Sequence, residues 1–424
     1  MLWLVIGYMF LFVFRPFEYW PVLGTYRIER VYMIALLVVL FLWQGKRHLT
    51  HSINNSILFF LGVMVVSSVW AFSTDDAYQA TFDYFKLVVF YFVIVLTIRD
   101  ERQLKIFMVA YIAVLFLYVG KSAWEFFVHG RYVYNMGIKR MPGLDTTYGD
   151  PNAFAASIAY SLPFLWALIK YRFEQPLIRK MLWAYALLAG VCIIATGSRS
   201  GMVTSLLFLL LVFFSTSRKV TGVTLLLALL AFVWNVMPLD YQQRFKSAFF
   251  RGVAPQAQAA DASAQGRLES LKQGIKMFME SPLLGIGPGN FKYGWDHAPV
   301  GPSAHNLYGE LLGETGVMGL LVFSALVILI VRTHRTIIER ATLFLTVHAA
   351  NAPPASVDNM RLLRLLSSAS VQVVVLLLFN GNFGRNLYRY NWLWIGAIAV
   401  LSFHFLNQEL KRSGAIAGLK ARRS

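Results

Sequence analysis

Two arginines stand where a guanidinium could hold an anion. Arg199 lies in the turn Thr196-Gly-Ser-Arg-Ser-Gly201, and Arg267 begins an amphipathic segment. Arginine keeps its charge, and its planar fork of donors suits phosphate oxygens. An interfacial side chain that reaches lipid headgroups also explains Arg199, and a structural ion pair also explains Arg267. Each arginine is therefore a candidate anion ligand with a structural alternative.

His305 is the candidate for proton transfer. Ser303, just after Pro302, is predicted to cap a helix, which would place His305 in its first turn. Unsatisfied amide donors and the positive end of the helix dipole favour a neutral imidazole there. A neutral imidazole can take a proton, as a general base must. The alternative is an interfacial histidine that bonds a loop carbonyl.

Two carboxylates follow His305 on the same predicted helix. Glu310 and Glu314 are four residues apart and precede an apolar stretch. We expect them near the membrane boundary, where they pair with outward arginines and position other groups. Asn306 lies immediately after the histidine and is a candidate for substrate binding.

A further polar stretch lies at the start of the predicted span 152–169. Asp150 as cap and Pro151 as first helical residue follow the chemistry of helix starts. A binding role for Asn152 is therefore secondary. No Cys/His cluster or Asp-rich triplet marks a metal site. We expect no metal and no cofactor, and charge stabilisation then falls to arginine.

Most of the chain consists of apolar runs that must position these residues. Of 424 residues, 57% are hydrophobic and 14% are charged, whereas soluble domains have about a quarter charged residues. The net charge of +18 does not indicate nucleic acid, because the basic residues mostly separate apolar runs. Lone Cys192 lies inside such a run, where we expect core packing. The composition predicts an all-α integral membrane protein surrounded by membrane lipids.

The apolar runs predict about twelve transmembrane helices, each of which needs roughly 17–25 residues if untilted. The predicted spans are 2–14, 31–43, 56–72, 84–98, 104–127, 152–169, 181–196, 201–215, 219–236, 306–331, 367–380 and 392–407. The chain then divides into nine spans over residues 1–236, a loop over 237–304, and three spans with a basic tail over 305–424.

Loop charge predicts the orientation. One set of alternate connections carries 21 Lys and Arg residues, and the other carries 9 when the long loop 237–304 is left out. Short basic loops favour the cytoplasm. Both termini are therefore predicted to be cytoplasmic, and the long loop and all the candidate residues to lie on the outer face.

The long loop is predicted to contain one amphipathic helix. Leu268, Leu271, Ile275 and Phe278 recur at helical spacing, so this helix should lie on the membrane or on the domain surface. The Ala/Gln-rich stretch 254–265 is interpreted as flexible loop. The glycine-rich run 285–289 lacks the preceding strand and the Gly-Lys-Ser/Thr of a phosphate loop, so we expect an irregular turn.

These motifs together resemble the O-antigen ligase and O-antigen polymerase superfamily of bacterial envelope glycan assembly. The resemblance rests on Gly197-Ser-Arg-Ser-Gly201, on Arg267 through Pro282-Leu-Leu-Gly-Ile-Gly-Pro-Gly-Asn-Phe291, and on His305-Asn306 with Glu310, Glu314 and Gly316. It also covers the multi-span layout and the long outward loop. A membrane-embedded fold of the glycosyltransferase type C kind is implied by the resemblance.

The resemblance also implies a reaction. Ligases of this family move a glycan from undecaprenyl pyrophosphate onto a sugar hydroxyl of lipid A core, at the periplasmic face of the inner membrane. Arg199 and Arg267 would hold the pyrophosphate, and His305 would deprotonate the acceptor hydroxyl, with inversion. Arg15, Arg385 and Arg389, all predicted to face outward, would help to bind acceptor phosphates.

Three other functions fit parts of the pattern. The polymerase that extends the same lipid-linked glycan is the nearest alternative, and a protein O-oligosaccharyltransferase usually has a longer chain. A lipid or solute transporter would need no chemistry, but transporters tend to place charges within broken spans and to contain repeats. Here the spans are nearly free of charge, with Lys86 and Lys121 as exceptions. The length and the single dominant loop favour the ligase.

Overall fold

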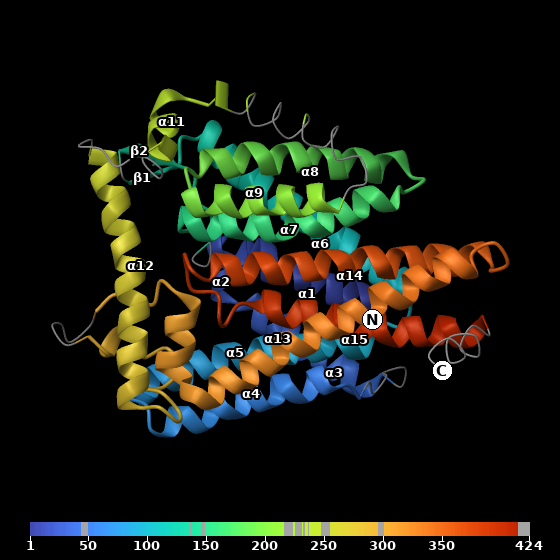
Figure 1. The fold of residues 1–424 in the computed structure, drawn as a ribbon, viewed down its shortest axis with the longest axis horizontal. Coiled ribbons are helices and arrows are strands. Elements are labelled where there is room, and N and C mark those ends of the chain that lie inside the picture. Colours follow the sequence, from blue (N-terminus) through green and yellow to red (C-terminus); the bar gives the residue numbers. More distant parts are fainter. Residues whose placement is uncertain are drawn as a thin grey trace.

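A computed structural model describes residues 1–43, 50–135, 137–145, 149–215, 237–246, 255–295 and 301–413, with isolated positions between 216 and 236. Nearly all of this part of the chain is helical, and most helices lie side by side as a bundle (Figure 1). The bundle helices are α1 (Leu2–Phe14), α2 (Pro21–Thr25), α3 (Ile28–Leu42), α4 (Ser52–Val69), α5 (Thr74–Thr97), α6 (Glu101–Phe127), α7 (Pro151–Tyr171), α8 (Pro176–Ala195), α9 (Arg199–Phe214), α13 (Leu307–Val347), α14 (Pro354–Asn380) and α15 (Tyr390–Arg412).

Smaller elements complete the described part. They are the 3-10 turns η1 (Pro16–Glu18) and η2 (Phe291–Tyr293), the helices α11 (Leu239–Lys246) and α12 (Pro255–Glu280), and the strands β1 (Val133–Asn135) and β2 (Ile138–Arg140). The two strands form an antiparallel hairpin in which Val133 pairs with Arg140.

Eight of the described helices are long and apolar enough to cross a membrane: α4, α5, α6, α7, α8, α13, α14 and α15. They coincide with eight of the predicted spans, so the all-α, multi-pass character is confirmed. Helices α1, α3 and α9 also coincide with predicted spans, but they have 13, 15 and 16 residues. The predicted span 219–236 lies almost entirely outside the described residues. The number twelve therefore stays a prediction.

Local sequence explains where several helices begin. Asp150 accepts hydrogen bonds from the backbone N–H groups of Asn152 and Ala153, at 2.7 and 3.0 Å, with Pro151 as first helical residue. Ser198 caps α9 in the same way, by accepting from the N–H of Gly201 at 3.1 Å. Such caps satisfy amide groups that have no partner within the helix.

One predicted loop is helical, and the prediction for it is wrong. Residues 255–265 belong to α12, because alanine and glutamine are strong helix formers and a proline suits the first helical turn. The predicted connection 332–366 is mostly helix as well, because α13 continues to Val347 and α14 begins at Pro354. The end of an apolar run marks where a helix can leave the membrane, but the helix itself can continue beyond that point.

Helices α15 and α7 lie deepest in the bundle. Within their most apolar 18 residues, 78% and 72% of positions are buried, compared with 28% in α8. Trp392 is fully buried in this core, and Cys192 is buried as predicted. The well-packed centre gives the ends of these helices a fixed relative position.

Candidate active site

Helix α12 lies across one end of the bundle, where α7, α9 and α13 begin (Figure 1). It packs on the first turns of α13 through a glycine contact. A Cβ at Gly274 would come within 2.3 Å of the carbonyl oxygen of Gly309, so a larger residue would force the two helices apart. This close approach brings residues 267–277 against residues 304–313.

The face of α12 that packs on α13 is not the predicted apolar stripe. Ser270, Gly274 and Met277 are buried, whereas Leu268 and Ile275 are 53% and 42% exposed. Small residues permit the closest approach of two helices, so they form the contact. Leu268 and Ile275 are left on the outer side of α12, where they suit a membrane surface.

His305 lies immediately before α13, not in its first turn. Asn306 is the N-cap, because its Oδ1 accepts hydrogen bonds from the N–H groups of Tyr308 and Gly309 at 2.9 and 3.0 Å. The predicted cap at Ser303 is therefore wrong. The N–H of His305 donates to Oγ of Ser270 at 3.0 Å, which ties the histidine to α12.

The surroundings of His305 favour its neutral form. The protein around the ring lowers the pKa of His305, and the positive charges of Arg385 and Arg267 lower the pKa further, while Asp150 opposes them. The side chain is nevertheless exposed at this end of the bundle. An exposed, neutral imidazole beside cations is the form that a general base requires.

Arg267 and Arg199 lie near enough to repel each other. Burial lowers the pKa of Arg267, Arg199 lowers it further, and Asp150 raises it. The guanidinium carbon of Arg267 also lies 5.4 Å from the centre of the Phe383 ring. Arg199 is the first residue of α9, directly after the Ser198 cap. The structure thus brings the predicted pair of arginines together with His305.

Arg140 belongs to the same cluster, and the sequence analysis did not single it out. It is 1% exposed, and its Nε and Nη2 donate hydrogen bonds of 2.8 Å to the Thr196 carbonyl and to Oδ1 of Asn152. Burial lowers its pKa, Asp150 raises it, and Arg199 lowers it. The only sequence signal for Arg140 as a buried connecting residue is its location in a polar segment that is predicted to face outward.

Asn152, a predicted substrate ligand, already has protein partners on its side-chain oxygen. That oxygen accepts from Arg140 and from Oγ of Ser198, the latter at 2.9 Å. The contacts join the start of α7 to the turn before α9. Asn152 therefore helps to hold Arg140 and the turn before Arg199 in place. Substrate binding by Asn152 stays a prediction.

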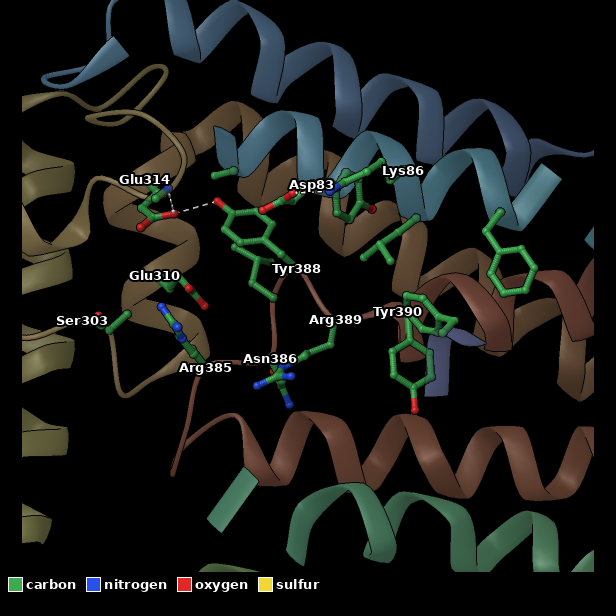
Figure 2. A pocket seen from close by; sticks show the side chains of 18 of the residues that line it. Asp83, Lys86, Ser303, Glu310, Glu314, Arg385, Asn386, Tyr388, Arg389 and Tyr390 are labelled. Atoms are coloured by element: carbon green, nitrogen blue, oxygen red, sulfur yellow. Dashed lines mark hydrogen bonds and ion pairs between the residues drawn. The ribbon is translucent and has the colours of Figure 1, made fainter. Parts of the chain in front are cut away.

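A cavity of about 550 Å³ begins beside His305, at Ser303 and Ala304 (Figure 2). Its charged lining comes from the end of α1, the start of α3, α5, the 289–292 turn, α13 and the segment before α15. The aromatic lining lies mainly on α1, α5 and residues 388–390. The charged lining residues are Arg15, Glu29, Asp83, Lys86, Lys292, Glu310, Glu314, Arg385 and Arg389. Five of the predicted binding residues therefore share one cavity.

Glu314 fixes the wall of this cavity. Its carboxylate accepts hydrogen bonds from the N–H groups of Gly289 and Phe291, at 2.8 and 3.1 Å, and from the Tyr388 hydroxyl at 2.8 Å (Figure 2). Residues 285–289 form the irregular turn that was predicted, with positive φ at Gly285, Gly287 and Gly289. One carboxylate thus holds the glycine turn to the segment before α15.

Metal ligation finds no support in the described part of the chain. No group of three or more His, Cys, Asp or Glu side chains is gathered there in a way that could hold a metal ion. The cations that act on His305 are the arginines Arg385 and Arg267, and guanidinium groups suit an anionic ligand.

Comparison with protein families identifies the region that carries most of these residues. Residues 184–324 match the O-antigen ligase family model. This region, about a third of the chain, includes Arg199, Arg267 and His305 as well as Glu310 and Glu314. The O-antigen ligase match supports membership in that superfamily, as the resemblance predicted. No curated protein sequence matches the chain. The match supports a function of the O-antigen ligase or polymerase type.

Proposed function

We propose that the chain is an O-antigen ligase that transfers a glycan from undecaprenyl pyrophosphate to a sugar hydroxyl of lipid A core. The family match over residues 184–324 supports this class of reaction. The observation that carries the proposal is the position of His305, whose pKa is lowered, beside Arg267 and Arg385. The proposal includes a glycosyltransferase type C fold and a reaction without metal or cofactor.

His305 is the general base of the proposed reaction. It takes the proton of the acceptor hydroxyl while the hydroxyl oxygen attacks the anomeric carbon of the glycan. The bond from that carbon to the pyrophosphate oxygen breaks, and its electron pair leaves with undecaprenyl pyrophosphate. Attack from the side opposite the leaving group inverts the anomeric centre. A positioned base of this kind typically contributes about 10²–10⁴-fold.

Arg199 and Arg267 are the proposed pyrophosphate ligands. Burial and then the charge of Arg199 lower the pKa of Arg267, so the two arginines lie near enough to share one anion, which supports this role. An anion between two neighbouring cations removes their repulsion, and fixed cations offset the charge that develops on a leaving group.

In this proposal, the distribution of Lys and Arg among the loops determines which side of the membrane carries the arginine cluster. The arginine cluster surrounds the start of α7, and α7 ends at Tyr171, whose hydroxyl contacts Lys105 and Asp358. Lys105 belongs to the loops with more basic residues, which are expected in the cytoplasm. The cluster would then face the periplasm of the inner membrane.

Transport without chemistry is less well supported. The two lysines that interrupt the predicted spans each pair with an acid on their own helix, Lys86 with Asp83 at 2.6 Å and Lys121 with Glu125. Pairing within one helix leaves neither lysine as an unpaired intramembrane charge of the kind that marks a transport pathway.

The deciding experiment offers purified, liposome-embedded protein an undecaprenyl-pyrophosphate glycan with and without lipid A core. Glycan on the core supports the ligase, and longer glycan on the same carrier would make the chain a polymerase. Glycan on an added protein acceptor would identify an oligosaccharyltransferase, and movement of intact donor without product would indicate a transporter. Transfer should persist in EDTA, and its loss, restored by a divalent cation, would contradict a metal-free reaction.

A further inference from the structure

Glu310 is a buried carboxylate with an unused oxygen on the cavity wall. The residue is 4% exposed, and its Oε2 has no hydrogen-bond partner. The backbone N–H of Leu387 interacts with the same carboxyl group. A buried carboxylate oxygen without a donor is costly. This oxygen is therefore available to accept a hydrogen bond from a bound ligand.

Arg385 lies across the same part of the cavity. Figure 2 shows Glu310 on α13 and Arg385 on the segment before α15, both directed into the cavity. No ion pair joins these two residues, and Oε2 of Glu310 has no hydrogen-bond partner. The positive charge of Arg385 also lowers the pKa of His305. The unbridged pair therefore lies next to the proposed base.

Other charges in this cavity already have direct partners. Lys86 pairs with Asp83 at 2.6 Å, and Lys292 pairs with Asp76 at 2.9 Å. Glu314 accepts three hydrogen bonds from the protein. Glu310 and Arg385 differ from these groups because no ion pair joins them across the cavity. Their arrangement leaves room for a ligand between them.

A hydroxyl group fits between a carboxylate and a guanidinium better than a phosphate does. The hydroxyl hydrogen can donate to the carboxylate while its oxygen accepts from the guanidinium. A phosphate in the same place would be repelled by Glu310. Aromatic side chains line the same cavity, including Tyr84, Tyr388 and Tyr390, and aromatic surfaces suit the C–H faces of a sugar ring.

We propose that Glu310 and Arg385 form the two sides of a sugar-hydroxyl subsite that holds the acceptor beside His305. This inference rests on the proposed function and refines the expectation that Arg385 binds acceptor phosphate. Glu310 and Arg385 are positioning residues, because the reacting hydroxyl itself lies at His305.

The test measures glycan transfer by Glu310→Ala, Glu310→Gln and Arg385→Gln variants at varied donor and acceptor concentrations. Hydrogen bonds to charged groups are worth about 1.5–3 kcal/mol, so Glu310→Ala should raise the KM for lipid A core about 10–100-fold. Glu310→Gln keeps an acceptor oxygen and should rescue part of the loss. Arg385→Gln should also raise this KM, and the donor KM should stay within about twofold in all three variants.

Glu269→Gln is the matched control, because Glu269 is an exposed carboxylate on α12 whose bond is to Gln265 on the same helix. Its kinetics should equal those of the wild type. Thermal melting in detergent checks that each variant folds. If Glu310→Ala fails to fold, Arg385→Gln provides the test, because Arg385 is exposed and its replacement should not disturb folding.

Monodeoxy acceptors separate hydroxyl binding from a merely structural role. One deoxy sugar should be used equally by wild type and Glu310→Ala, because the missing hydroxyl removes the interaction that the variant lacks. An unchanged acceptor KM in folded Glu310→Ala, or an equal penalty with every deoxy acceptor, would overturn the subsite. A lower KM for phosphorylated core would instead indicate a phosphate there and would also overturn it. Absence of transfer by the wild type would defeat the proposed function, and the subsite with it.

Discussion

Arg140 donates one hydrogen bond to Oδ1 of Asn152 and another to the Thr196 carbonyl, each over 2.8 Å. A single buried side chain therefore connects the β1–β2 hairpin, the first turn of α7 and the turn that precedes Arg199. The position of Arg199 depends on all three segments. Stability and catalysis should consequently be coupled at Arg140.

Arg140→Ala should lower both stability and transfer, because it removes the donor of the Thr196 carbonyl and one of the two donors of Oδ1 of Asn152. The expected loss in the free energy of unfolding is about 1–3 kcal/mol, measured as a lower melting temperature in detergent. Arg140→Lys should not restore the wild type, since an ammonium cannot reproduce the guanidinium fork. Lys139→Ala, at the exposed neighbouring position, is the control and should melt like the wild type. Normal melting by Arg140→Ala would contradict this account.

His305→Ala should abolish glycan transfer while the protein still folds. The loss should reach about 10²–10⁴-fold in kcat, as for removal of a general base. Single-turnover assays with preloaded donor and saturating lipid A core measure it directly. The side chain of His305 is exposed, so melting should change little. Transfer at the wild-type rate would exclude His305 as the base.

Arg199→Ala and Arg267→Ala should impair use of the donor much more than use of the acceptor. Each removes a cation from the proposed pyrophosphate site, so the donor kcat/KM should fall by at least about tenfold. Kinetics at varied donor with saturating lipid A core, and then the reverse, separate the two effects. An effect confined to the acceptor KM would count against both arginines as pyrophosphate ligands.

The pH dependence of transfer should follow His305. Burial, Arg385 and Arg267 lower its pKa, so the active neutral form should persist to a pH below the ordinary value of about 6.5. Activity should fall only as pH drops through that lowered pKa. Arg385→Gln removes a neighbouring positive charge, which raises the pKa of His305 and should move the acid limb to higher pH. A shift toward lower pH would have the wrong sign.

Gly274→Val should separate α12 from α13. Its side chain would meet the backbone of Gly309, because even a Cβ there would come within 2.3 Å. Overpacking of this kind costs about 1–3 kcal/mol, and displacement of α12 should also move Arg267 and reduce transfer. Gly266→Ala, in the same helix with nothing within 4 Å of an added Cβ, is the matched control. Equal melting temperatures for the two variants would show that the contact is not needed.

The amino-acid sequence alone determined the features that depend on near neighbours in the chain. Apolar runs predicted the helices that are long enough to span a membrane, and Asp150 with Pro151 predicted the start of α7. The glycine-rich run predicted an irregular turn, because glycines permit positive φ. Hydrophobicity, however, could not predict that α12 begins at residue 255 or that α13 continues to 347.

Tertiary structure decided which distant residues meet. The apolar stripe of α12 suggested its packing face, but the close approach of Gly274 to Gly309 placed the small residues inside. Arg140 gained its role only because the hairpin packs on α7 and on the turn before α9. Glu310 likewise differs from Glu314 through its surroundings, since Glu314 receives protein donors and Oε2 of Glu310 has none. Local propensities act over a few residues, whereas these contacts depend on how whole helices pack.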